Sequence, residues 1–182
     1  MKTRDLIECA IFAAIICVFS VMTIPTGIIP VTMGTFGIML TAVVLGWKKG
    51  TIAVLVFILL GAVGLPVFSG FKGGIGVLAG PTGGYITGYI VMTLVSGALA
   101  ARLPQKRAAQ MGKVFAVLAL GMVLCYTLGT IQFMFVAKKS LAASLALCVT
   151  PFIPFDLIKC ALAAFIGVSV RNILIKAKLK IA

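Results

Sequence analysis

An aspartate and a lysine lie three residues apart near the end of the chain, within a segment that is otherwise apolar. They are Asp156 and Lys159, in residues 151–159, whose sequence is PFIPFDLIK. On a helix that begins near Phe152, this spacing places both side chains on one face. A carboxylate accepts hydrogen bonds from N–H groups and an ammonium binds a carboxylate, so the pair could recognise a polar ligand. The alternative is that the two charges neutralise each other and only hold neighbouring helices together.

A second candidate for ligand contact is a glycine-rich stretch, residues 70–88, which holds eight of the twenty glycines of the chain. It contains neither the phosphate-binding P-loop pattern nor the dinucleotide fingerprint. In a membrane protein, which the composition below indicates, non-helical backbone persists only where it is buried or lines a water-filled cavity. We therefore expect the loop with Gly80 and Thr82 to form the wall or lid of a binding site, with Lys72 as its charged residue. Close helix packing through Gly84 is the alternative for the helical end.

Aromatic and amide side chains near these segments could complete a site. Tyr85 and Tyr89 are four residues apart, so they share one face of a predicted helix, and Tyr85 adjoins the glycine-rich loop. A single aromatic residue is more often part of the core or in contact with lipid than in contact with a ligand. Further candidates for aromatic surface are Phe36, Phe68, Phe71 and Tyr126. Gln132 is a rare polar side chain inside a predicted span.

Small side chains follow one face of the first predicted helix. Ala10, Ala13 and Ala14 would let a second helix approach closely. That helix could belong to the same chain or to a partner protein.

Composition places all these residues in a membrane protein. Of the 182 residues, 62% are hydrophobic and only 10% are charged, whereas about a quarter of the residues are charged in a typical soluble domain. Residues 9–47 contain no charged side chain at all. Soluble globular, disordered and disulfide-scaffold classes are therefore excluded.

The residue types that the chain lacks exclude several kinds of chemistry. There is no histidine, which argues against histidine-based metal sites and Ser-His or Cys-His catalysis. The five cysteines stand singly in apolar segments without a CxxC pair, so we expect neither a metal site nor disulfides. Asp156 is the single carboxylate expected inside the membrane, so an enzyme that uses it with Lys159 as acid and base is disfavoured. We expect no enzyme and no cofactor.

Apolar runs of about 20 residues predict helices that span the membrane, because one span needs about that length. The predicted spans cover residues 6–24, 31–47, 51–67, 83–101, 114–137 and 152–175. Prolines, glycines and lysines separate them, and a less regular segment before Pro151 is a candidate for an interfacial helix. The expected fold is an all-α integral membrane protein of six transmembrane helices, with the glycine-rich loop between the third and the fourth.

The basic residues predict the orientation. The net charge of +13 would suggest nucleic acid in a soluble protein, but here the basic residues lie mostly between the apolar runs. Cytoplasmic loops carry an excess of Lys and Arg, and twelve of the sixteen basic residues fall on the side of the N-terminus. We therefore expect both termini in the cytoplasm and no nucleic-acid partner. The twelve are Lys2, Arg4, Lys48, Lys49, Arg102, Lys106, Arg107, Lys113, Arg171, Lys176, Lys178 and Lys180; Lys72, Lys138 and Lys139 fall outside, and Lys159 lies in the last span.

Taken together, these segments resemble the BioY family of biotin transporters, the biotin-specific S components of energy-coupling factor (ECF) transporters. The resemblance covers nearly the whole chain. The most specific motifs are residues 64–69 (GLPVFS), 72–74 (KGG) and 80–85 (GPTGGY), supported by residues 151–159. Residues 29–32 (IPVT) match the first-loop pattern of the family, which usually has a glutamine where this chain has Gly34.

The resemblance implies a single membrane domain over residues 1–182, with a pocket open to the outside. Asp156 and Lys159 would be the polar contacts from the last helix, and residues 71–82 with Tyr85 would complete the pocket. Biotin has a ureido ring with two N–H donors, a thioether ring and a carboxylate. Asp156 could accept bonds from the ureido N–H groups, while either Lys159 or Lys72 could pair with the carboxylate.

The implied function is high-affinity capture of biotin outside a prokaryotic cell membrane and its delivery inward with an energy-coupling module. Ala10 and Ala14 match the small-residue patch that S components present to the transmembrane coupling subunit. The chain has no nucleotide-binding motif, so separate ATPase subunits would supply the energy. The alternative function is that of an S component for another small vitamin. A purely structural membrane subunit would leave the charge pair and the glycine-rich loop without a purpose.

Overall fold

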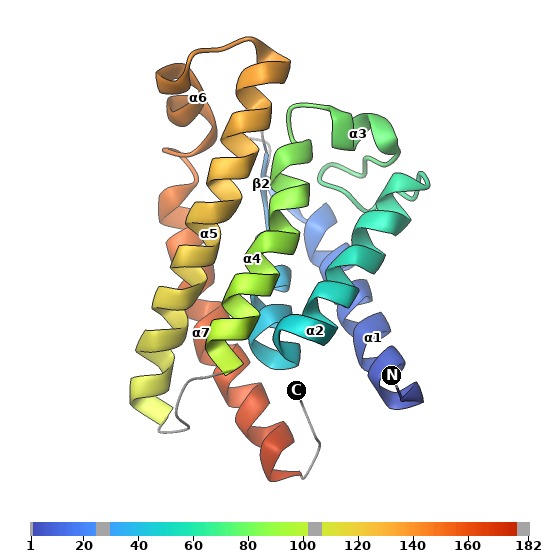
Figure 1. The fold of residues 1–182 in the computed structure, drawn as a ribbon, viewed down its shortest axis with the longest axis vertical. Helices are drawn as coiled ribbons and strands as arrows, with labels where there is room; N and C mark the ends of the chain where they lie inside the picture. Colours follow the sequence, from blue (N-terminus) through green and yellow to red (C-terminus); the bar gives the residue numbers. More distant parts are fainter. Residues whose placement is uncertain (1, 25–29, 102–106, 178–182) are drawn as a thin grey trace.

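The computed structural model describes residues 2–24, 30–101 and 107–177, and the side chains of residues 107–109 are not described. Figure 1 shows long helices packed side by side into a bundle. The helices are α1 (Thr3–Val21), α2 (Gly34–Ala62), α3 (Ile75–Ala79), α4 (Gly83–Ala101), α5 (Arg107–Ala137), α6 (Leu141–Cys148) and α7 (Ile153–Lys176). Several residues that the sequence assigned to loops lie outside the described part: Pro25, Gly27, Arg102, Pro104, Lys106, Lys178 and Lys180.

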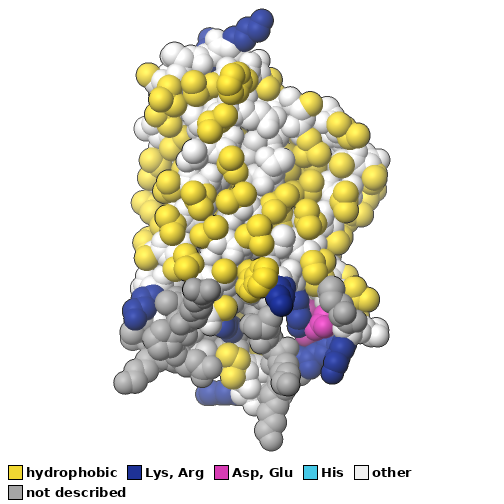
Figure 2. Space-filling model, viewed as in Figure 1, with side chains coloured by type: hydrophobic (Ala, Val, Ile, Leu, Met, Phe, Trp, Pro, Cys, Tyr) yellow, Lys and Arg dark blue, Asp and Glu magenta, His cyan; other side chains and the backbone are white. Residues whose placement is uncertain are grey.

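The apolar character of the bundle confirms a helical membrane protein. Four helical stretches are long and apolar enough to cross a bilayer: Gly34–Ala62, Gly83–Ala101, Gln110–Ala137 and Ile153–Lys176. In Figure 2 hydrophobic side chains cover the middle of the visible face, and basic side chains gather at its two ends. This arrangement matches an apolar band between two polar interfaces.

The predicted second and third spans form the two halves of α2. The backbone at Gly46 is not helical, with φ 72° and ψ −172°, a conformation that glycine adopts at little cost. The kink folds the chain back, so Gly50 lies against the backbone of Thr41 and Ala42. The reversal therefore occurs at Gly46, before the predicted turn at Lys48.

The first predicted span ends earlier than expected. Helix α1 stops at Val21, and Thr23–Ile24 forms the short strand β1, which pairs antiparallel with β2 (Val31–Thr32). Ile24 precedes a proline, and the residue before proline is biased toward extended backbone. The all-α prediction thus holds except for this two-stranded pair.

The glycine-rich loop between α2 and α4 is held against the ends of the bundle. A β-bridge joins Phe68 to Lys72, and the Phe68 ring fills the space where a side chain at Gly61 would lie. The Gly74 amide donates to the carbonyl oxygen of Gly61 at 2.7 Å. Helix α3, which the sequence did not predict, follows within this loop.

Helices α4 and α5 pack closely at glycines. A side chain at Gly84 would clash with the backbone of α5 at Leu128, and one at Gly88 would press on Cys125. The packing interpretation of the helical end of the glycine-rich stretch is therefore supported. On α5, Gly129 leaves room for the ring of Tyr85, so the ring position depends on that missing side chain.

Candidate ligand-binding site

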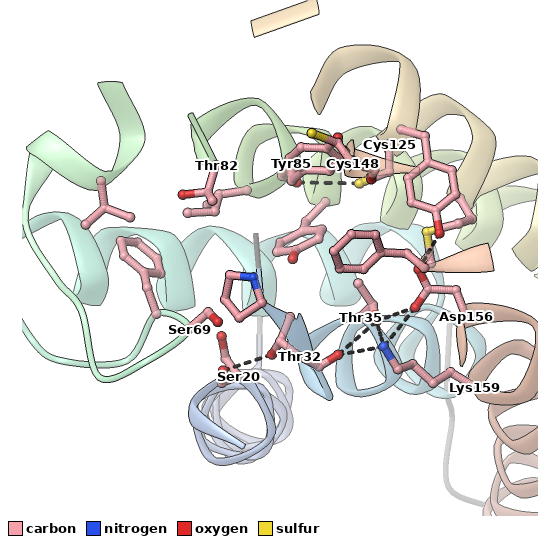
Figure 3. Close-up of a pocket in the computed structure, with 18 of the residues that line it drawn as sticks. Ser20, Thr32, Thr35, Ser69, Thr82, Tyr85, Cys125, Cys148, Asp156 and Lys159 are labelled. Atoms are coloured by element: carbon pink, nitrogen blue, oxygen red, sulfur yellow. Dashed lines mark hydrogen bonds and ion pairs between the residues drawn. The ribbon is translucent and has the colours of Figure 1, made fainter. Parts of the chain in front are cut away.

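A cavity lies within the bundle and is lined by residues from α1, β2, α2, the glycine-rich loop, α3, α4, α5, α6 and α7. It holds about 880 Å³ of empty space, counted out to its open mouth. Figure 3 shows polar side chains at two sides of it, with Asp156 and Lys159 on one and Ser20, Ser69 and Thr82 toward the other.

The ammonium group of Lys159 is held by three acceptors. Its Nζ lies 2.8 Å from Oδ1 of Asp156, 2.7 Å from the carbonyl oxygen of Thr32 and 3.2 Å from Oγ1 of Thr35. An ammonium has three donors, so this network can use them all. Lys159 is only 5% exposed, and its charge is therefore neutralised and hydrogen-bonded inside the bundle.

The carboxylate of Asp156 is equally well enclosed, at 5% exposure. The Tyr126 hydroxyl donates to Oδ2, and the Thr35 hydroxyl lies 3.4 Å from Oδ1. A carboxylate offers about four acceptor positions. Asp156 thus keeps acceptor capacity for N–H donors of a ligand in the cavity.

The local fold explains why these groups meet. Asp156 and Lys159 are three residues apart in the first turns of α7, so they share a face. Thr32 links three elements. Its hydroxyl donates to the carbonyl oxygen of Ser20 in α1 at 2.9 Å and accepts from the Gly34 amide of α2 at 2.9 Å, and its carbonyl oxygen accepts from Lys159 of α7. The end of α1 and the start of α2 are thereby fixed beside α7.

Aromatic side chains form the middle of the cavity wall. Tyr85 and Tyr89 of α4 are nearly buried, with Phe57, Phe68 and Phe152 on other elements. The Tyr85 hydroxyl donates to the carbonyl oxygen of Cys148 at 3.4 Å, which joins α4 to the end of α6. This wall suits an apolar ring or chain of a ligand.

The glycine-rich loop supplies the polar groups of the opposite side. Lys72, Ser69 and Thr82 line the cavity. Lys72 is exposed and forms no ion pair with any residue that the structure describes. The buried Ser69 hydroxyl likewise has no hydrogen-bond partner within the described chain. Both groups therefore remain available to a ligand.

The comparison with protein families identifies the family of this chain. The model of the BioY family matches residues 1–176. The chain belongs to the BioY family. The resemblance inferred from the glycine-rich and last-helix motifs is thereby confirmed.

Curated relatives and a solved structure agree with this membership. The chain is 41% identical to the "Biotin transporter BioY" of Thermotoga maritima over 170 residues, which cover 93% of this chain and 97% of that protein. It is 40% identical to the protein of the same name from Rhizobium etli, over 92% of each chain. The crystal structure of "the S-component for biotin from an ECF-type ABC transporter" matches with a TM-score of 0.83 and 29% identity, over 94% of this chain and 95% of that one.

Six of the side chains predicted as ligand contacts in this BioY family member meet at the cavity. They are Lys72, Thr82, Tyr85, Tyr89, Asp156 and Lys159, and two of the candidates for aromatic surface, Phe68 and Tyr126, also line it.

Four other predicted contacts do not line the cavity, so their contact with a ligand stays a prediction: Phe36, Phe71, Gly80 and Gln132. Phe36 packs edge-on against Phe19, with ring centroids 5.3 Å apart. Phe71 is 69% exposed. Gln132 donates to the carbonyl oxygens of Leu78 and Gly80, at 2.8 and 2.9 Å, and so holds the loop in place.

Sequence reasoning missed several polar residues of the site. Thr32, Thr35, Ser20 and Ser69 line the cavity but carry no pattern of their own. Tyr126 was noted only as aromatic surface, although its hydroxyl contacts Asp156. The available signals were two motifs of the BioY resemblance, IPVT, which contains Thr32, and GLPVFS, which ends at Ser69.

Proposed function

We propose that this protein is a biotin-binding S component of an ECF transporter, which captures biotin from outside the cell. As a member of the BioY family it is a transporter component and not an enzyme. The observation that carries the proposal is the cavity, because it combines the buried Asp156–Lys159 pair, an aromatic wall and Lys72, whose cation pairs with no acid among the described residues. Relatives that match nearly the full chain are named biotin transporters.

The ureido ring of biotin fits the polar side formed by Asp156. One of its N–H groups donates to the acceptor position that Lys159, Thr35 and Tyr126 leave free on the carboxylate. The carboxylate forms an ion pair with Lys159 at 2.8 Å, and charge-assisted hydrogen bonds are stronger than neutral ones. Lys159 thus acts by positioning Asp156.

The carboxylate of biotin fits Lys72 better than Lys159. The three donors of Lys159 already have acceptors within 3.2 Å, so a new partner would displace one of them. Lys72 lines the same cavity from the loop. We assign the carboxylate to Lys72, with the Ser69 hydroxyl, which has no partner among the described residues, as a further donor three residues earlier in the chain.

Selectivity follows from the enclosed polar groups. A ligand without a ureido N–H group would leave that acceptor position of Asp156 without a partner in an aromatic surrounding, which costs about 1–3 kcal/mol. The thioether ring and the methylene chain contact the tyrosine and phenylalanine rings between the two polar sides.

Six spans with both termini in the cytoplasm are the topology that we propose. They are α1, the two halves of α2, α4, α5 and α7. Figure 1 places the start of α1 and the end of α7 at the same end of the bundle. Lys49 at the α2 reversal pairs with Asp5 and Glu8 of α1, at 2.7 and 2.8 Å, which brings that reversal to the same end. The glycine-rich loop then faces the outside of a prokaryotic cell.

The exposed face of α1 is the proposed docking surface for the transmembrane coupling subunit. Ala13 is 2% exposed and packs into the bundle, whereas Ala10 and Ala14 are exposed on the outer face. ATPase subunits bound to the coupling subunit would supply the energy. Trp at both Ala10 and Ala14 should abolish co-purification with the coupling module while biotin binding persists. Loss of biotin binding in that variant would instead make the face internal packing.

A ligand screen tests the function. Purified protein in detergent is heated with biotin and with other water-soluble vitamins, each at the same concentration. Because a ligand that binds only the folded chain raises its thermal stability, biotin should produce the largest rise in Tm. A larger rise with another vitamin would make the protein an S component for that vitamin. No rise with any of them would reject the proposal.

A further inference from the structure

A second hollow lies on the outside of the bundle, in the groove between α5, α6 and α7. It holds about 1040 Å³ of empty space, counted out to its open face. Its apolar lining includes Val123, Ile131, Leu141, Leu145, Ile153 and Leu157. We call it the α5–α6–α7 groove.

The groove opens onto the membrane-facing surface. Val123 of α5 is 57% exposed, Leu145 of α6 is 41% exposed and Leu157 of α7 is 46% exposed, so all three walls are uncovered. Helices α5 and α7 are two of the stretches able to cross a bilayer. In a bilayer such an apolar hollow is filled by lipid, because the acyl chains are the surrounding solvent.

A pair of cations stands at one end of the groove. Lys138 and Lys139 follow the end of α5, and Leu141, two residues later, already lines the groove. Both lysines are exposed, and neither pairs with an acid among the described residues. Basic side chains at a membrane surface attract anionic headgroups.

We propose that the α5–α6–α7 groove binds one acyl chain of an anionic phospholipid, whose phosphate pairs with Lys138 and Lys139. The apolar walls and the cation pair together match the two chemical parts of such a lipid. This inference rests on the membrane embedding of the chain and not on its binding of biotin.

The lipid would lie against the same residues that form the ligand site. Tyr126 and Asp156 line both the internal cavity and the groove. The Tyr126 hydroxyl, which donates to Asp156, therefore stands between the two hollows. An acyl chain in the groove keeps water away from this hydrogen bond and so preserves its strength in an apolar surrounding.

Native mass spectrometry of the full chain tests the proposal. Detergent-purified protein is mixed with phosphatidylglycerol or with phosphatidylcholine of the same acyl chains. The wild-type chain should retain one phosphatidylglycerol under activation that removes other lipids. Leu145→Trp fills the groove and should lose this lipid, whereas Leu147→Trp on the same helix, outside the lining and 45% exposed, should keep it.

The cation pair is tested separately from the groove. Replacing Lys138 and Lys139 by Gln should abolish the preference for phosphatidylglycerol over phosphatidylcholine. The matched double replacement at Lys113 and Lys176 removes the same charge elsewhere and should leave the preference intact.

The proposal is overturned if Leu145→Trp retains phosphatidylglycerol as the wild type does. It is also overturned if both double lysine variants lose the preference for phosphatidylglycerol over phosphatidylcholine to the same extent. If Leu145→Trp does not elute as a folded protein, Ile131→Trp fills the groove from α5 instead. Biotin plays no part in this measurement, so failure of the proposed function would appear as absent biotin binding with the lipid still retained.

Discussion

The buried pair of Asp156 and Lys159 should be required for ligand binding beyond any role in stability. We consider three variants: Asp156→Asn, Lys159→Met and the double variant. Each single change leaves one charge without its partner in a site where both side chains are 5% exposed. The double change removes both charges and leaves a neutral, well-filled interior.

The magnitudes follow from the geometry. Two unit charges 2.8 Å apart attract by about 6 kcal/mol at an effective dielectric constant of about 20. Desolvation offsets most of this, so replacing both partners is often nearly neutral, whereas removing one costs about 3–5 kcal/mol. For a chain of this size that cost corresponds to a fall of about 10 °C in Tm. The double variant should recover most of it.

Thermal unfolding in detergent gives the stability of each variant, and isothermal titration calorimetry gives its biotin affinity. We expect the double variant to be almost as stable as the wild type and yet to bind no biotin. If it binds biotin as the wild type does, the pair only holds helices together and the assignment of Asp156 is wrong. If its loss of stability equals the sum of the two single losses, the two charges are not coupled.

Two further predictions concern the cavity wall. Lys72→Gln should weaken biotin binding about fivefold, since an exposed ion pair is worth about 1 kcal/mol. The variant should also bind biotin and its methyl ester equally in calorimetry; Lys113→Gln is the charge-matched control, and persistent discrimination by Lys72→Gln would show that another residue binds the carboxylate. Gly129→Ala should displace the Tyr85 ring at a cost of about 1–3 kcal/mol and lower biotin affinity. At Gly112 on the same helix, an alanine side chain would meet no described atom within 4 Å, so Gly112→Ala should leave the affinity unchanged, and equal affinities of the two variants would contradict the role of the ring.

Features that depend on local sequence were predictable. The span predicted over residues 83–101 has the same bounds as α4. The span predicted over residues 152–175 differs from α7 by one residue at each end. The spacing of Asp156 and Lys159 placed both on one helical face, and they do pair. In each of these cases the physical cause lies within a few turns of one helix.

Features that depend on packing between distant segments were not predictable. Thr35 and Asp156 are 121 residues apart, and Tyr126 and Asp156 are 30 apart, so no spacing rule joins them. The reversal of α2 depends on the positive φ of Gly46, which is one glycine among twenty. The turn was predicted at Lys48, two residues later, because charged residues separate predicted spans. Gln132 was expected in the site because it is a rare polar side chain in a span, but its amide is used by the loop.

Equilibrium dialysis of radiolabelled biotin against the purified chain in detergent tests the central claim most directly. The proposed site predicts saturable binding of one biotin for each chain, displaced by unlabelled biotin and absent in the Asp156→Asn/Lys159→Met double variant. A folded wild-type chain without saturable binding, or a double variant that binds as the wild type does, would contradict it.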